Sequence, residues 1–133
     1  RQDATFFAAE DIGANDAVSL DLAQAIDGDK ALKVMKADTG TATDKCFVGI
    51  ALEAAAVGAR IDVCIAGICE ANVAGTTAAG SVLQIGSTAG RLDGRTTAVN
   101  EGGAATFNLF PVCGIAAEAD TANVATIFVF KQF

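Results

Sequence analysis

Residues 46–53 (CFVGIALE) and 60–66 (RIDVCIA) are the stretch of this sequence that decides its fold. Apolar side chains occupy alternate positions of the latter segment, at Ile61, Val63 and Ile65. This period-two alternation is typical of a β-strand that buries one face. Gly58 lies in the link of small residues between the two segments and suits a tight turn. The stretch therefore predicts a β-hairpin.

The alternation changes just after this hairpin, at Gly67. Apolar residues occupy odd positions up to Ile65, whereas the next large apolar residue is Ile68. A β-bulge or a bend at a glycine changes the side of a strand on which its apolar residues lie. We therefore expect a bulge or a bend of the strand at Gly67.

Shorter segments that resemble strands flank the hairpin. They cover residues 17–22, 31–36, 82–85, 106–117 and 124–130. Polar or glycine-rich stretches separate them: those at 27–29 and 38–45 predict a turn and a hairpin loop, and the one at 87–105 predicts a long exposed loop or a hairpin. A helix over 16–26 competes with the first strand because Val18, Leu22 and Ile26 recur every four residues, but the alternation of Val18, Leu20 and Leu22 favours the strand.

The end of the chain is apolar on both faces of its last predicted strand, Thr126–Phe130. Such a strand lies inside a sandwich or barrel, or at a boundary between subunits. Five of the eight phenylalanines fall between Phe107 and Phe133, so we expect the aromatic part of the core in this region.

A short internal sequence repeat relates the central hairpin to the end of the chain. Residues 49–54 (GIALEA) and 114–119 (GIAAEA) are identical at five of six positions, and each is followed by a small polar turn and an apolar strand. A repeated pattern of this kind predicts a repeated hairpin. With the strands above, it favours an all-β, mainly antiparallel fold, either a small β-barrel or a β-sandwich.

The first sixteen residues (RQDATFFAAEDIGAND) differ from the rest in being acidic and weakly patterned. The chain of 133 residues fits one domain, so we expect an extended N-terminal arm at 1–16 and a single β domain at 17–133. Phe6, Phe7 and Ile12 are the candidate partner-binding residues of this arm. The alternative is that the adjacent phenylalanines fold back onto the core of their own domain.

Composition narrows the classes of partner. The net charge is −7, and seven acids against two bases place most of it in the first thirty residues. The negative electrostatic field of these acids opposes direct binding to nucleic acid, and there is no Trp or Tyr to stack on bases. No apolar run is long enough for a membrane span. A charged fraction of 19% leaves little polar surface and favours oligomerisation or docking on a larger assembly.

The sequence offers no set of residues for catalysis or metal binding. It has no His and no Tyr, and Glu53 and Glu118 are interpreted as solvated residues of equivalent turns. No phosphate-binding motif is present, and Asp27 and Asp29 are too few for a calcium site. We therefore expect no catalytic residue, no cofactor and no metal site, and a protein that is not an enzyme.

The four cysteines, Cys46, Cys64, Cys69 and Cys113, show no C-x-x-C spacing. Without histidine, a zinc site would need all four thiolates at irregular spacing. Each cysteine lies in an apolar segment and is interpreted as a small buried side chain, with disulfides as the alternative.

Residues 48–72 (VGIALEAAAVGARIDVCIAGICEAN) and 78–92 (AAGSVLQIGSTAGRL) resemble the capsid decoration, or cement, proteins of tailed bacteriophages. That family shows Gly-(Ile/Val)-Ala-x-x-x-Ala, then Gly-x-x-(Val/Ile)-x-Val, and later an Ala-Gly-Asp-x-Leu turn. In the corresponding turn here, residues 79–83, Ser81 replaces the acid. The resemblance covers about a third of the chain.

The resemblance implies a β-barrel or β-sandwich on the outer capsid surface of a virion. It implies the major capsid protein as partner, self-association as a homotrimer, and a mechanical role in bridging neighbouring capsid subunits. Neither direct nucleic acid binding nor a membrane is expected. Two alternatives stay open: another self-assembling virion or surface module such as a tail, fibre or surface layer subunit, and a small ligand-binding β-barrel.

Overall fold

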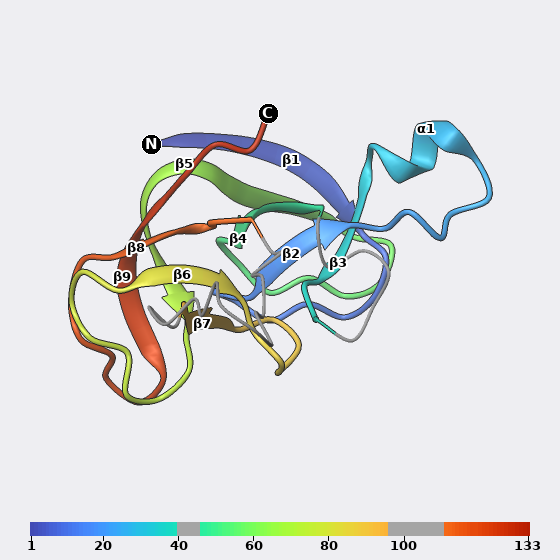
Figure 1. Ribbon diagram of the computed structural model, residues 1–133. Helices are drawn as coiled ribbons and strands as arrows, with labels where there is room; N and C mark the ends of the chain where they lie inside the picture. Colours follow the sequence, from blue (N-terminus) through green and yellow to red (C-terminus); the bar gives the residue numbers. More distant parts are fainter. Residues whose placement is uncertain (40–45, 96–110) are drawn as a thin grey trace, which may run out of the picture.

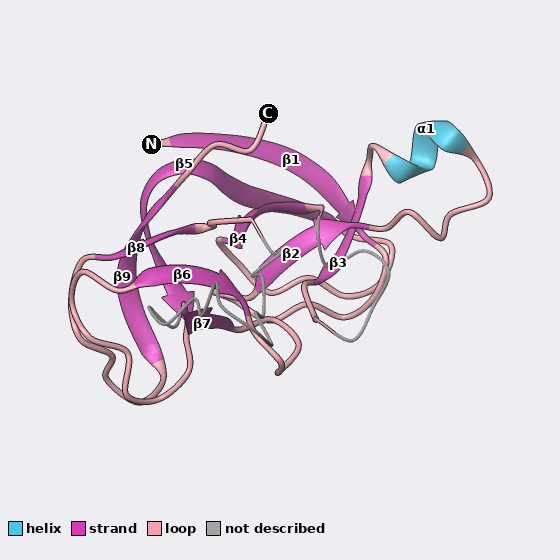
Figure 2. Ribbon diagram, in the orientation of Figure 1, coloured by secondary structure: helices cyan, strands magenta, loops and turns pink. Residues whose placement is uncertain are grey.

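The computed structural model describes residues 1–39, 46–95 and 111–133, and these are built almost entirely of strands (Figures 1 and 2). The described strands are β1 (Gln2–Ala8), β2 (Ala17–Leu20), β3 (Lys33–Lys36), β4 (Phe47–Ala51), β5 (Arg60–Asn72), β6 (Val82–Ile85), β7 (Leu92–Gly94), β8 (Gly114–Ala116) and β9 (Val124–Val129). The described helix, α1 (Asp27–Lys30), is a single turn.

The first five strands form a closed barrel in the order β1-β3-β2-β4-β5, because β5 pairs with β1 as well as with β4. All pairs are antiparallel except β1 with β3. Its interior is filled by buried apolar side chains that form one cluster: Phe6, Ala8, Ile12, Val18, Val34, Val48, Ala51, Ala55, Ile61, Val63 and Ile65. The barrel thus holds a packed core.

The remaining strands repeat this arrangement. Beyond Gly67, β5 continues into a sheet of order β5-β9-β8-β6-β7. A parallel bridge from Val73 to Leu92 brings β7 back to the end of β5 and closes the sheet. Its interior belongs to a second apolar cluster, which includes Ala71, Val73, Leu83, Ile85, Leu92, Cys113, Ala116, Ala125, Ile127 and Val129. The expected all-β, mainly antiparallel barrel is confirmed.

Gly67 is the junction between the two barrels. Its φ of +101° lies in the left-handed region that favours glycine, and a Cβ there would come within 2.8 Å of the Arg1 Cα. Close by, the register of β1 on β5 shifts between Gln2 and Asp3. The predicted bend at Gly67 is confirmed, and Ile68, the residue after it, is 52% exposed.

The two barrels match strand by strand: residues of β2 and β4 correspond to residues of β6 and β8 that lie 65 positions later, whereas Val34 of β3 corresponds to Leu92 of β7, 58 positions later, because the loop before β7 is shorter. Ala17 pairs with Ile50 between β2 and β4, and Val82 pairs with Ile115 between β6 and β8. The turn before each pair also matches. Asn15 has a φ of +68° and Gly80 a φ of +84°, and their N–H groups donate to equivalent carbonyls of β4 and β8.

We call β1–β4 with residues 60–66 the first repeat, and residues 67–72 with β6–β9 the second repeat. The repeated hairpin predicted from 49–54 and 114–119 is part of this larger duplication. β4 followed by β5 has the same register as β8 followed by β9, since Ile50 pairs with Cys64 and Ile115 with Phe128. The short sequence repeat therefore marks a tandem repeat of a whole barrel.

The expectation of a detached arm at 1–16 is wrong. Residues 2–8 form β1, which lies between β3 and β5 and pairs with β5 over most of its length. The physical reason is the alternation of buried Phe6 and Ala8 with exposed Thr5 and Phe7, which is a strand pattern that needs the barrel to cover one face. The N-terminal residues are part of the first core.

Most other predicted elements are confirmed. β2, β3, β4, β6 and β9 lie within the segments predicted as strands, so the helix over 16–26 is not formed. The single-turn α1 replaces the turn expected at 27–29, and β7, which pairs with β6, lies in the stretch expected as a loop or a hairpin at 87–105. The predictions for residues 40–45 and 96–110 fall outside the described residues.

Candidate interaction surface

Reactive side chains do not gather in the described part of the chain. Its His, Cys, Asp and Glu residues form no group of three or more that could hold a metal ion. Glu53 and Glu118 are both exposed at the equivalent turns of the two repeats. Glu118 accepts a hydrogen bond from the Thr126 N–H at 3.0 Å, and this bond lowers the pKa of its carboxyl. This carboxylate therefore stabilises a turn.

A hollow of about 300 Å³ lies between the β5–β6 connection and the end of β7. Its lining is small and polar: Ala74, Gly75, Thr76, Thr77, Ser81, Asp93, Gly94 and Arg95. The polar groups are already engaged locally. Thr77 donates to the Ala74 carbonyl at 2.7 Å, Asp93 accepts from the Ser87 N–H, and Arg95 donates to Gln84. These bonds hold the loops around the hollow.

The four cysteines are free thiols, and three of them are buried: Cys64, Cys69 and Cys113. Burial raises the pKa of the Cys113 thiol from an ordinary 9.0 to about 12. Burial, and then the neighbouring Cys64, also raise the pKa of Cys69. Thiols held protonated in this way are poor nucleophiles. They agree with the interpretation of the cysteines as small buried side chains.

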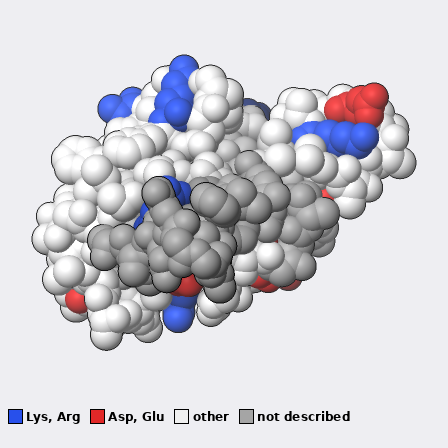
Figure 3. Space-filling model, viewed as in Figure 1, with Lys and Arg blue, Asp and Glu red and all other residues white. Residues whose placement is uncertain are grey.

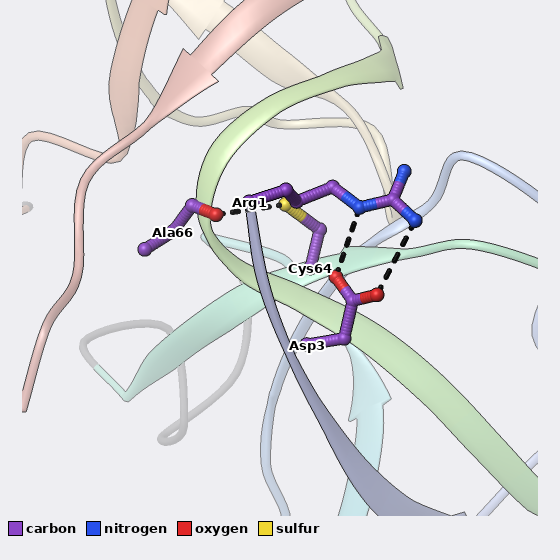
Figure 4. A network of polar contacts seen from close by, with 4 residues as sticks. All are labelled: Arg1, Asp3, Cys64 and Ala66. Atoms are coloured by element: carbon purple, nitrogen blue, oxygen red, sulfur yellow. Dashed lines mark hydrogen bonds and ion pairs between the residues drawn. The ribbon is translucent and has the colours of Figure 1, made fainter.

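One of these thiols, Cys64, lies at the seam between the repeats, next to the start of the chain (Figure 4). The Cys64 thiol donates to the Ala66 carbonyl at 3.6 Å. Beside it, the Arg1 guanidinium forms two contacts with the Asp3 carboxylate, 3.1 Å from Nε to Oδ1 and 3.3 Å from Nη2 to Oδ2. This exposed ion pair lies along β1 at the bend of β5.

The three residues predicted to bind a partner are not on one surface. Phe6 is 8% exposed and Ile12 is 3% exposed, and both belong to the core of the first barrel. Ile12 is also held by a bridge to Ala55. Phe7 alone of the three is exposed, at 41%. Burial in the barrel core thus removes Phe6 and Ile12 from the candidate site, and Phe7 stays a candidate.

An apolar row crosses the outer face of the second repeat. The row consists of cross-strand neighbours on four successive strands, β5, β9, β8 and β6: Ile68, Phe128, Ile115 and Val82. Phe128 is 45% exposed and Val82 is 37% exposed, and Phe130 extends the row along the chain after β9 at 40%. Contiguous exposed apolar side chains of this kind mark interaction sites.

A second exposed apolar surface is the α1 loop, which we define as residues 21–32 between β2 and β3. Three of its side chains are exposed: Leu22 at 42%, Ile26 at 66% and Leu32 at 49%. The acids around α1 are paired, Asp27 with Lys30 at 2.7 Å and Asp29 with Lys33 at 3.8 Å. Figure 3 shows acidic and basic side chains together at this end of the molecule.

The sequence patterns did not predict the α1 loop as a surface, and of the apolar row they pointed only to the segment that holds Phe128 and Phe130. The last predicted strand is apolar on both faces, and this pattern predicted that it lies in a core or at a boundary between subunits. The structure divides that strand, because Ile127 and Val129 are buried whereas Phe128 is exposed. In the α1 loop, the sequence pattern placed Leu22 in the strand predicted at 17–22 and Ile26 only in the competing helix. Their isolation among polar and small residues was the available signal.

No helix among the described residues is both long and apolar enough to cross a membrane.

No protein-family model and no curated protein matches the chain. Among solved structures, it is similar to the crystal structure of the head fiber gp8.5 N base in bacteriophage phi29. The alignment covers 97% of this chain and 93% of that chain, with a TM-score of 0.61 and 14% sequence identity. The two proteins therefore share a fold over their whole matched length.

Proposed function

We propose that this protein is a structural component of a bacteriophage virion that decorates the outer surface of the capsid and stabilises it by bridging major capsid protein subunits. The observation that carries the proposal is the likeness, over nearly the whole chain, to the head fiber base of bacteriophage phi29. The proposal includes that the protein is not an enzyme and binds no cofactor.

The surface supports a mechanical role. The described surface has exposed apolar side chains on strands. Polar side chains such as Thr77 and Asp93 instead form hydrogen bonds within their own loops and turns. A barrel with a packed interior keeps such a surface in place without a ligand. Cementing by many copies gains from multivalency, so each contact can be modest. The net charge of −7 also disfavours attachment to the packaged genome.

The test is co-sedimentation of the purified protein with shells assembled from the major capsid protein of the same genome. We expect saturable binding and a higher melting temperature of the decorated shells. Phe7→Asp should weaken binding, because Phe7 is the exposed member of the predicted partner-binding set. Val57→Asp, at a side chain 66% exposed in the turn before β5, is the matched control. Absence of binding to any shell form would contradict the proposal.

A second candidate function is the base of a fibre, which is what the phi29 neighbour is. In that case the chain would carry a further fibrous segment or partner on its outer side and would still bind the shell. Electron microscopy of the decorated shells separates the two, because a cement protein forms a low cap and a fibre base supports an extended projection. Open-ended polymerisation without shells would instead favour a tail, fibre or surface layer subunit.

A further inference from the structure

We propose that copies of this chain associate head to tail, with the apolar row of one copy covered by the α1 loop of the next. This contact would repeat between copies the contact that joins the two repeats within one chain. The inference concerns self-association and does not depend on the capsid as partner.

The first step is that the outer face of the first repeat is covered. Five of its side chains that do not belong to the barrel interior are fully or almost fully buried: Ala17, Ala37, Phe47, Ile50 and Cys64, at 0 to 3% exposure. All five belong to the same cluster as the interior of the second barrel. They are therefore buried because the second repeat packs on them.

The second step is that the described residues do not cover the equivalent face of the second repeat. By strand register and position, the counterparts of those five residues are Val82, Arg95, Val112, Ile115 and Phe128. None of these five is buried, and Val82 and Phe128 are exposed. Four of the five are apolar, and Phe128 stands where the first repeat has the smaller Cys64. Within the described part of the chain, the second repeat therefore leaves open the face that the first repeat buries.

The third step is to identify what covers the face in the first repeat. The β6–β7 loop, residues 86–91, lies against it and makes backbone hydrogen bonds. The Ala17 N–H donates to the Gly90 carbonyl at 2.8 Å, and the Gly90 N–H donates to the Ala37 carbonyl at 2.9 Å. The Thr39 N–H donates to the Gly86 carbonyl at 3.3 Å. The loop between the second and third strands of a repeat is thus a covering element.

In the first repeat, the loop at the corresponding place is the α1 loop. It joins β2 to β3 as residues 86–91 join β6 to β7, but it is longer. Its apolar side chains Leu22, Ile26 and Leu32 are exposed, so they are not packed against the described part of their own chain. The described residues therefore include an open face of the kind that such a loop covers, and a loop of this kind whose apolar side chains are exposed.

These two surfaces lie at opposite ends of the molecule, with α1 at one end and β8 and β9 at the other (Figure 1). They cannot meet within one chain, so the partner must be a second copy. A contact between two different patches is heterologous, and it closes into a ring or continues as a chain according to the rotation between copies. The observed contact between the repeats provides the template for its geometry.

The experiment measures the mass of the full-length protein in solution by sedimentation velocity. We expect the wild type to form oligomers above its monomer mass of 13.3 kDa. Phe128→Asp in the apolar row and Ile26→Asp in the α1 loop should each shift the protein to monomer. Val57→Asp, as exposed as Ile26 but outside both surfaces, should leave the oligomer unchanged. Circular dichroism confirms that each variant is folded, and Ile68→Asp replaces Phe128→Asp if that variant is not.

Mixing the two monomeric variants tests the direction of the contact. The Phe128→Asp chain keeps its α1 loop, and the Ile26→Asp chain keeps its apolar row. A head-to-tail contact therefore predicts a one-to-one heterodimer in the mixture and nothing larger. A mixture that stays monomeric, a wild type that is monomeric at every concentration, or a Val57→Asp variant that dissociates equally would each overturn the proposal.

Discussion

Gly49 and Gly114 occupy the same place in the two repeats, each pressed against a carbonyl of the following strand. A Cβ on Gly49 would overlap the Cys64 carbonyl oxygen, and a Cβ on Gly114 would overlap the Phe128 carbonyl oxygen. Both obstacles are backbone atoms of paired strands, which cannot rotate away as a side chain can. The glycine that opens the repeated Gly-Ile-Ala sequence is thus required by close strand contact.

We predict that Gly49→Ala and Gly114→Ala each lower the free energy of unfolding by at least about 1–3 kcal/mol, the usual cost of overpacking. The two losses should be similar because the two sites are equivalent. Urea unfolding of the purified variants measures them. Gly28→Ala is the control, because a Cβ there meets nothing within 4 Å, and its effect should be small. A Gly114→Ala variant as stable as the wild type would contradict the equivalence.

The hairpins could be predicted from sequence because strand alternation and glycine turns are local signals. The duplication of the whole barrel could not, because matching positions share a physical role and not a residue. Asn15 and Gly80 both satisfy a positive φ, and Phe6 and Ala71 both fill a barrel interior, yet neither pair is similar in sequence. Only the Gly-Ile-Ala segments kept enough identity to be recognised.

The N-terminal strand escaped prediction for a different reason. The main partner of β1 is β5, which lies far along the chain. Local sequence therefore does not show which strand covers Phe6. The interaction surfaces had a similar ambiguity. Ile127 and Phe128 are adjacent large apolar residues, and only the packed barrel decides which of the two points inward.

Removing residues 1–16 is predicted to unfold the protein, because it takes β1 out of the closed barrel together with three core side chains. A sharper version compares two neighbours of β1. Phe6→Ala should cost about 3–5 kcal/mol of stability, as expected for a buried phenylalanine. Phe7→Ala should cost about 1 kcal/mol or less, because Phe7 is on the exposed face. Chemical denaturation measures both, and equal losses would show that the face assignment is wrong.

Stability is predicted to fall at alkaline pH, partly through Cys113. The folded protein raises the pKa of this thiol from 9.0 to about 12, so between these values the unfolded chain releases a proton that the folded chain keeps. The stabilisation is complete below pH 9 and is lost as the pH rises towards 12. Urea unfolding at several pH values should give a shallower alkaline decline for Cys113→Ala than for the wild type. Identical declines would contradict this assignment.

Two buried hydroxyl groups are predicted to respond in opposite ways to removal. The Ser19 Oγ is buried and has no hydrogen-bond partner among the described residues, whereas the Thr77 Oγ1 donates to the Ala74 carbonyl at 2.7 Å. A buried polar group without a partner costs stability, and a satisfied one contributes to it. Ser19→Ala should therefore raise the free energy of unfolding by about 1 kcal/mol, and Thr77→Val should lower it by about 1 kcal/mol. Both changes keep the side chain close to its original size, so cavity effects stay small. Thermal and urea unfolding of the two variants against the wild type measure the difference, and a destabilised Ser19→Ala variant would show that its hydroxyl has a partner in the folded protein.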